Sequence, residues 1–247
     1  MRSFLRILRN HNNMTLDTTI HKNVLIKVLK DIYSDSALGP ILGFKGGTAA
    51  YLFYDLHRFS VDLDFDLLDS GKEEYVFDQV KKILEEYGIL KEVENKRYNL
   101  FYLLSYENKI EGAQNIKVEI NKRDFDSKYE IKNYLGIPMK VMTQEDMSAH
   151  KMVAMYERIG EASRDIFDVC FFLQKDWPIN IKIIESRTEM SFKEFLSKCI
   201  ELLEGLDDRN ILDGMGELLD EKQKAWAKAK MRKETIFLLK LKSENQK

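Results

Sequence analysis

The chain has 247 residues, of which 44% are hydrophobic, enough for one large domain or two modest domains with proper cores. Its 39 basic and 41 acidic residues give a formal net charge of −2, which excludes a polycation that binds nucleic acid indiscriminately. Two cysteines outside any C-x-x-C spacing and four histidines without metal-ligand spacing argue against a disulfide framework and a zinc site.

The hydropathy pattern predicts a cytoplasmic protein that makes no use of a membrane. The opening MRSFLRILRN is too short and too charged for the apolar core of a signal peptide, and no window reaches membrane-spanning length. Cys170 and Cys199 lie in apolar helical contexts. We expect both to be buried thiols in a reducing compartment.

In chain order, periodicity predicts helices and strands over residues 15–33 (helix), 41–44 (strand), 48–56 (helix), 61–66 (strand), 73–87 (helix) and 89–94, 98–106 and 116–121 (strands). A hairpin-like connection through 108–112 joins the last two strands. From Thr143 onward the pattern is helical, apart from a break at Trp177-Pro178. We therefore expect an α/β (α+β) fold, with a small mixed-sheet core in residues 1–138 and a helical C-terminal region in residues 139–247.

The turn between the first strand and its helix contains Gly46 and Gly47. Glycine adopts sharp turn angles at low cost and lets a ligand approach the backbone closely. Thr48 is expected to cap the helix, where free N–H groups and the helix dipole favour an anion such as phosphate. An ordinary turn followed by a capped helix is the alternative.

The strand at 61–66 has an acid at every position of one face: Asp62, Asp64 and Asp66. Carboxylates two residues apart repel each other unless a cation lies between them, and oxygen ligands beside a phosphate suit Mg²⁺ or Mn²⁺. A solvated acidic face is the alternative. A third metal-binding carboxylate is expected on a neighbouring strand, where Glu119 is the candidate and Asp66 competes with it, although a charge on an open strand face is commonplace.

These motifs resemble the signature of the DNA polymerase β-like nucleotidyltransferase superfamily: GGT at 46–48, thirteen residues, then D-x-D. Within that superfamily, RFSVDLD at 58–64 resembles the AbiEii/AbiGii toxin family, which includes the MenT-type toxins of toxin–antitoxin operons. KMVA at 151–154 and RDIFD at 164–168 resemble that family's later motifs. The resemblance covers about half of the chain and implies a nucleotidyltransferase fold.

The resemblance implies roles for residues of the first block. Residues 46–48 and Arg58 would bind the nucleotide, although Arg58, like Lys45, could be a solvated surface charge. Ser60 should share a strand face with Asp62, where its hydroxyl would contact a triphosphate oxygen or a metal-bound water. A hydroxyl bonded to backbone at the start of the strand is the alternative for Ser60.

Lys151 belongs to a segment that begins like a capped helix at Thr143. It shares a face with Met147 and Ala154, and a lone lysine in such a place usually extends to water. The resemblance implies instead that it contacts phosphate. His150 points about 100° away from Lys151 around the helix and is expected to be structural.

Asp165 and Asp168 share one face of the next helix, for which Ser163 offers an N-cap. The helix dipole alone would explain an acid in the first turn. The resemblance adds Asp165 to the active centre, orienting Lys151 or the attacking group. For Asp168, an ion pair with Arg164 is the alternative.

Together these features predict a metal-dependent nucleotidyltransferase built around Asp62 and Asp64, and the resemblance implies that Ser60, Lys151 and Asp165 are catalytic as well. The resemblance implies a toxin that transfers a nucleoside monophosphate from an NTP to tRNA or a protein and is neutralised by a separately encoded antitoxin. Alternatives are an antibiotic-type enzyme with a small-molecule acceptor, or a nucleotide-binding protein without turnover.

The basic run at 222–233, which includes Trp226, is a candidate RNA contact or simply a solvated helix face.

Overall fold

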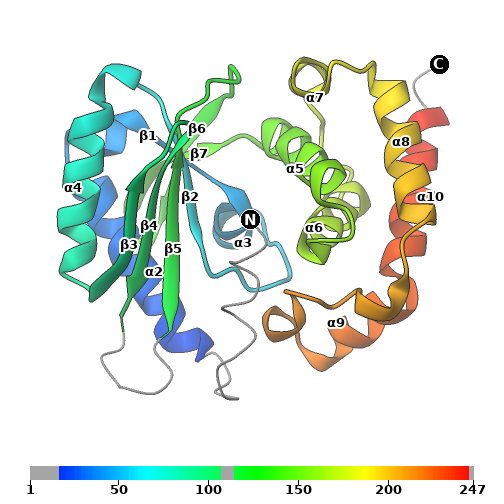
Figure 1. Ribbon diagram of the computed structural model, residues 1–247, viewed down its shortest axis with the longest axis horizontal. Helices are drawn as coiled ribbons and strands as arrows, with labels where there is room; N and C mark the ends of the chain where they lie inside the picture. The colour runs from blue at the N-terminus through cyan, green and yellow to red at the C-terminus, as the bar shows by residue number, and fades with distance from the viewer. Residues whose placement is uncertain (1–16, 107–113, 245–247) are drawn as a thin grey trace.

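The computed structural model describes residues 17–106 and 114–244. Seven strands form one mixed sheet in the order β3-β4-β5-β2-β1-β7-β6 (Figure 1). The strands are β1 (Leu42–Lys45), β2 (Leu63–Leu67), β3 (Ile89–Asn95), β4 (Asn99–Ser105), β5 (Asn115–Asn121), β6 (Tyr129–Tyr134) and β7 (Ile137–Met142).

Helices lie on both faces of the sheet. On one face lie α2 (Thr18–Ser34) and α4 (Glu73–Glu85), whereas α3 (Gly46–Phe53) lies on the other face, between the sheet and the C-terminal helices (Figure 1). The C-terminal helices are α5 (Gln144–Arg158), α6 (Ser163–Gln174), α7 (Ile181–Thr188), α8 (Phe192–Glu204), α9 (Glu221–Trp226) and α10 (Arg232–Glu244). The mixed-sheet α/β fold predicted from the sequence is confirmed.

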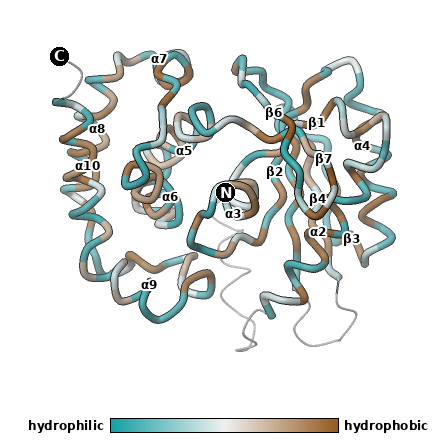
Figure 2. The backbone as a smooth tube through the Cα atoms, turned by 180° about the vertical axis from the view of Figure 1, so that it is seen from behind, coloured by the Kyte–Doolittle hydropathy of each residue, from teal (hydrophilic) through white to brown (hydrophobic). Residues whose placement is uncertain are grey.

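Amphipathic patterning explains these layers. In α4, Val76, Val80 and Leu84 recur every four residues and are fully buried against the sheet. Hydrophobic and hydrophilic residues alternate along both α4 and α10 (Figure 2), as expected for helices that bury one face. The core extends without interruption from the sheet into the C-terminal helices.

The centre of the sheet is the strand that carries the acidic motif. β2 pairs antiparallel with β1 and parallel with β5, so Asp64 lies opposite Lys45 on one side and Glu119 on the other. Leu63 and Phe65 alternate with the acids and are fully buried. This register brings the two candidate acidic strands side by side on the sheet face that looks toward the C-terminal helices.

Two strands, β6 and β7, were not predicted. They form an antiparallel hairpin whose turn contains Leu135 and Gly136, both with positive φ. β7 also pairs parallel with β1, so this hairpin belongs to the main sheet. A division of the chain at 138/139 would cut β7, and the change from sheet to helices falls at Thr143. The hairpin-like connection expected at 108–112 lies outside the described residues.

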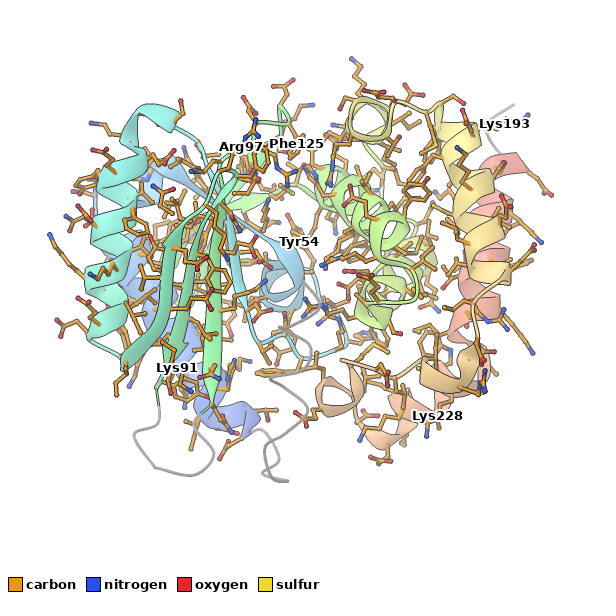
Figure 3. All side chains as sticks on the ribbon, in the orientation of Figure 1. Tyr54, Lys91, Arg97, Phe125, Lys193 and Lys228 are labelled. Carbon is orange, nitrogen blue, oxygen red and sulfur yellow. The ribbon has the colours of Figure 1, made fainter. Side chains whose placement is uncertain are left out.

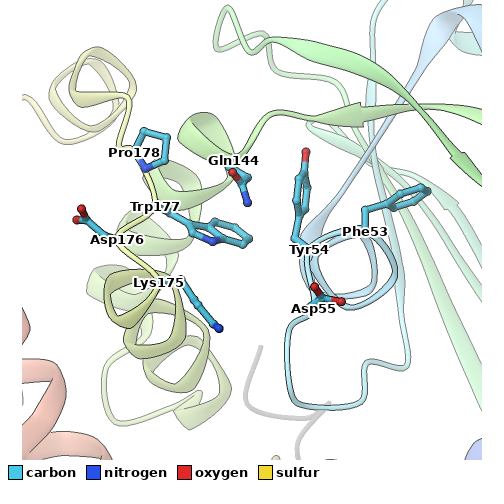
Figure 4. A pocket seen from close by; sticks show the side chains of 8 residues that line it. All are labelled: Phe53, Tyr54, Asp55, Gln144, Lys175, Asp176, Trp177 and Pro178. Carbon is cyan, nitrogen blue, oxygen red and sulfur yellow. The ribbon is translucent and has the colours of Figure 1, made fainter.

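A seam joins the sheet to the C-terminal helices. The Tyr54 hydroxyl donates to the backbone carbonyl of Met142 at 2.8 Å, and its ring centroid lies 5.3 Å from that of Trp177. Both rings line a pocket of about 370 Å³ together with Pro178 (Figure 4). As expected from Trp177-Pro178, the helical pattern breaks here, because α6 ends at Gln174 and α7 begins at Ile181.

Candidate active site

The diglycine turn lies directly against the acidic strand. Gly46 has φ +81°, and a Cβ at this position would collide with the carboxylate of Asp64. A Cβ at Gly47 would lie 2.8 Å from both Ser60 Oγ and Arg58 Nη2. Gly46 therefore requires glycine for both its φ and its space, and a side chain at Gly47 would displace Ser60 or Arg58.

Thr48 takes a different part from the expected cap. α3 begins at Gly46 with Lys45 as its N-cap residue, and no side chain caps it. Thr48 is buried inside the first turn, where its hydroxyl donates to the backbone carbonyl of Asp62. It therefore ties the glycine turn to the acidic segment.

Three carboxylates surround the ammonium group of Lys117. Its Nζ lies 3.1 Å from Glu119 Oε2, 3.8 Å from Asp62 Oδ2 and 3.9 Å from Asp64 Oδ1. Asn99 donates a hydrogen bond of 2.6 Å to the other oxygen of Glu119. Within the described ranges, no three acidic, histidine or cysteine side chains are arranged to hold a metal ion. A lysine cation occupies the space among these carboxylates instead.

Lys117 is the main functional candidate that the sequence reading missed. The strand pattern could have indicated it, because Lys117 and Glu119 are two residues apart and therefore share one face of the same strand. Burial acts to lower the pKa of Lys117, but the charges of Asp64, Asp62 and Glu119 outweigh it and raise that pKa. Burial likewise acts to raise the pKa of Asp64, but positive charges, first that of Lys117, lower it. Each partner therefore stabilises the charged form of the other.

Asp66 belongs to a different network. Its carboxylate accepts hydrogen bonds from Lys45 at 2.5 Å, Asn121 at 2.6 Å and Tyr129 at 2.5 Å, and only 6% of the residue is exposed. These contacts join β1, β2, β5 and β6. Because Asp66 is fully engaged, Glu119 is the better candidate for the third carboxylate of the site.

Arg58 joins the sheet to the C-terminal helices. Its Nε and Nη2 lie 2.6 and 2.7 Å from the two oxygens of Asp168, and at most 2% of either side chain is exposed. Burial acts to raise the pKa of Asp168, but Arg58 and Lys151 lower it. The alternative pairing with Arg164 is wrong, since Arg164 Nη1 instead lies 3.6 Å from Asp62 Oδ2. Arg58 is thus a buried ion-pair partner rather than a solvated charge.

Two buried acids hold Lys151 from behind. Its Nζ lies 2.8 Å from Asp168 Oδ2 and 3.2 Å from Asp165 Oδ1. The second oxygen of Asp165 lies 2.7 Å from Arg158 Nη2. Asp165 lies in the first turn of α6 as expected, but Ser163 is the first helical residue and does not cap the helix.

His150, predicted to be structural, is largely buried between two partners. Its Nε2 lies 2.8 Å from Ser127 Oγ, and its Nδ1 lies 2.9 Å from Arg187 Nη1. Burial, reinforced by the positive charges of Lys45 and Arg187, lowers the pKa of His150 to about 3.

These groups converge on one pocket of about 350 Å³ between the sheet and the C-terminal helices. Of the residues predicted to form the site, those that line the pocket are Gly46, Gly47, Arg58, Ser60, Asp62, Asp64, Glu119 and Lys151. Lys117, Arg158 and Arg164 line it as well. Thr48 and Asp165 lie behind this lining and hold its members in place.

A glycine turn beside paired aspartates, on the central strand of a mixed sheet, is the arrangement that the sequence led us to expect of a nucleotidyltransferase. The family described as "Nucleotidyl transferase AbiEii toxin, Type IV TA system" matches residues 27–235. The chain therefore belongs to the AbiEii toxin family and is a nucleotidyltransferase. No curated protein gives a significant match.

Solved structures share the fold. A putative nucleotidyltransferase from H. pylori is 22% identical, with a TM-score of 0.59 over 94% of this chain and 97% of that chain. The nucleotidyltransferase toxin MenT4 from Mycobacterium tuberculosis H37Rv is 18% identical, with a TM-score of 0.57 over 99% and 92%. At such identities the likeness concerns the fold alone. No helix within residues 17–106 or 114–244 is long and apolar enough to cross a bilayer.

Proposed function

We propose that this protein transfers a nucleoside monophosphate from an NTP to an acceptor within the pocket of about 350 Å³. The observation that carries this proposal is the convergence of the Gly46-Gly47 backbone, the Asp62 and Asp64 carboxylates and Lys151 on that one pocket. Glycine N–H groups at a helix start suit phosphate, and paired carboxylates suit the cation that accompanies it.

Basic side chains supply the charge for the triphosphate. Lys151, Arg158 and Arg164 come from α5 and α6 and face the glycine turn across the pocket. Asp165 and Asp168 fix Lys151, so we assign them positioning roles and assign the phosphate contact to the lysine. Ser60, beside the Gly47 backbone, would donate its hydroxyl to a phosphate oxygen.

We further propose that Asp62, Asp64 and Glu119 hold Mg²⁺ or Mn²⁺ once the Lys117 ammonium leaves the space among them, since with the lysine in place they are not arranged to hold a metal. Their oxygens are hard donors, and they already surround one cation, the Lys117 ammonium. A bound divalent ion supplies stabilisation of the charge that develops on the entering and leaving oxygens. In this proposal, Lys117 neutralises the carboxylates when no divalent ion is bound.

We propose tRNA or a protein as the acceptor and a separately encoded antitoxin as the partner that neutralises the toxin. A core up to Met142 would carry the catalytic acids, and the helical remainder would close the pocket with Lys151. Two buried free thiols, Cys170 and Cys199, support a cytoplasmic site of action. A small-molecule acceptor and nucleotide binding without turnover are the competing functions.

One labelling experiment tests this function. The purified chain is given Mg²⁺ and each α-labelled NTP in turn, together with total RNA, total protein or a panel of small hydroxyl compounds. We expect label on RNA or protein, loss of label with EDTA, and no label with Asp62→Ala. Label on a small molecule alone would overturn the polymer acceptor, and nucleotide binding without transfer would overturn the enzyme.

A further inference from the structure

Five side chains form an alternating stack, four of which line the pocket. The guanidinium carbon of Arg97 lies 4.9 Å from the Tyr98 ring centroid, and that of Arg123 lies 5.5 Å from the same centroid. Arg123 lies 5.4 Å and Arg187 5.0 Å from the Phe125 centroid. We call Arg97, Tyr98, Arg123, Phe125 and Arg187 the arginine–aromatic ladder. Figure 3 labels Arg97 and Phe125 at the same end of the sheet.

The ladder adjoins the catalytic carboxylates. Tyr98, Arg123, Phe125 and Arg187 line the same pocket as Asp62 and Asp64. Tyr98 immediately precedes Asn99, whose amide donates to Glu119 at 2.6 Å. A nucleoside bonded to a phosphate at the carboxylates would therefore have the ladder within the same cavity.

The ladder is accessible and carries excess positive charge. Tyr98 is 48% exposed, and Arg97 and Arg123 are exposed as well. Arg187 pairs with Glu157 at 3.2 Å, whereas neither Arg97 nor Arg123 forms an ion pair with any residue in 17–106 or 114–244. Planar aromatic and guanidinium groups stack on nucleobases, and unpaired arginines attract the phosphates attached to them.

We propose that the arginine–aromatic ladder is a nucleobase-stacking site. The base belongs either to the incoming NTP or to the terminal nucleotide of an acceptor strand, because both present the same ring beside a phosphate. Tyr98 is the exposed ring of the ladder, and Arg123 lies between it and the Phe125 ring. The choice of an NTP or an acceptor strand as the source of the base rests on the nucleotidyl transfer proposed above.

Binding measurements without turnover test this site. Affinities of the four NTPs, a short single-stranded oligoribonucleotide and inorganic tripolyphosphate are measured in EDTA for the wild type, Tyr98→Ala, Tyr98→Phe and Tyr75→Ala. Tyr75 is an exposed tyrosine on α4, on the opposite face of the sheet, and provides the matched control. We expect Tyr98→Ala to lower the affinity for base-containing ligands about tenfold. The affinities of Tyr98→Phe and Tyr75→Ala should stay within about twofold of the wild-type values.

Tripolyphosphate separates stacking from general damage, because it carries charge but no base. Its affinity should not change in Tyr98→Ala. A loss confined to NTPs assigns the base to the donor, and a loss confined to the oligonucleotide assigns it to the acceptor. Unchanged affinity for every base-containing ligand, or an equal loss for tripolyphosphate, would overturn the ladder site. Base-dependent binding by a wild type that transfers nothing would support the ladder and refute the proposed enzyme function.

Discussion

Two groups of residues at the pocket are built from the chain in different ways: the ladder, and a group that we call the acidic end, which comprises Gly46, Gly47, Ser60, Asp62, Asp64, Lys117 and Glu119. The acidic end takes its glycines, Ser60 and two of its acids from residues 46–64, so a single stretch of sequence reveals it. The ladder takes Arg97 and Tyr98 from the β3–β4 connection, Arg123 and Phe125 from the segment after β5, and Arg187 from α7. A short motif thus reports chemistry that is local in the chain, whereas a surface assembled by tertiary folding leaves no such pattern.

The two groups also differ in how their charges are neutralised. At the acidic end, Lys117 lies among three carboxylates, and Arg164 approaches Asp62. At the ladder, two arginines face solvent without an acidic partner among the described residues. We therefore expect substitutions at the acidic end to affect chemistry and stability, and those at the ladder to affect binding.

The largest effect should follow from Asp64→Asn. The change removes a charge from the carboxylate that lies against the glycine turn and opposite Glu119. If these acids act as proposed, the rate of transfer should fall by about a thousandfold or more, measured with labelled NTP under saturating Mg²⁺. Asp78→Asn makes the same chemical change at an exposed site on α4 and should keep the wild-type rate. Substantial transfer activity in Asp64→Asn would show that the Asp64 carboxylate is not required for catalysis.

The next largest effect concerns the buried pair behind the acidic end. Asp168→Asn leaves Arg58 and Lys151 without their shared carboxylate, so the free energy of unfolding should drop by about 3 kcal/mol. The pKa of Asp168 is lowered in the folded state. Its stabilising effect is therefore complete above the unfolded pKa, near 4, and is lost as the pH falls through the folded value.

Urea unfolding of both proteins at pH 7 and at pH 3 measures this dependence. The difference between wild type and variant should be largest at pH 7 and should shrink at pH 3. Asp176→Asn supplies the control, because it breaks an exposed ion pair with Lys242 and should leave the midpoint nearly unchanged. A difference that is equal at both pH values would show that the charge of Asp168 is not the cause.

A smaller and conditional effect is expected from Lys117→Met. Without the ammonium group, Asp62, Asp64 and Glu119 repel one another, so the melting temperature in EDTA should fall by about 3 °C. Mg²⁺ should restore it, giving the variant a larger Mg²⁺-dependent shift than the wild type. Lys122→Met removes a lysine that pairs with Glu73 outside the acidic cluster, and its shift should equal that of the wild type. Equal shifts in all three proteins would rule out a shared cation position.

The sequence identified the fold and the acidic end because both depend on local patterns. Alternation placed Asp64 and Glu119 on matching strands, and the register of β2 and β5 brings them together. Local patterns do not reveal the hairpin of β6 and β7, because β6 is a largely exposed edge strand and β7 contains Pro138, a residue that cannot donate a ladder hydrogen bond and is uncommon inside strands. The Arg58–Asp168 pair spans 110 residues, and no local pattern reports a contact of that range.

The smallest effect should come from the C-terminal basic run, which the sequence offered as an RNA contact. Within it, Arg232 is paired with Asp208, and Trp226 packs edge-on against Phe167.

Lys228→Gln/Lys230→Gln removes two charges from this run, and Arg97→Gln/Arg123→Gln removes two from the ladder. Lys228 lies far from Arg97 in Figure 3, so the pairs test separate surfaces. If the base held by the ladder belongs to an acceptor strand, labelling of RNA should change less than about twofold in the lysine pair. In the arginine pair it should fall about tenfold, with a weaker dependence on salt. A larger loss of RNA labelling in the lysine pair than in the arginine pair would place the acceptor strand at the C-terminal helices and not at the ladder. Loss of phosphate contacts must weaken binding wherever the strand lies.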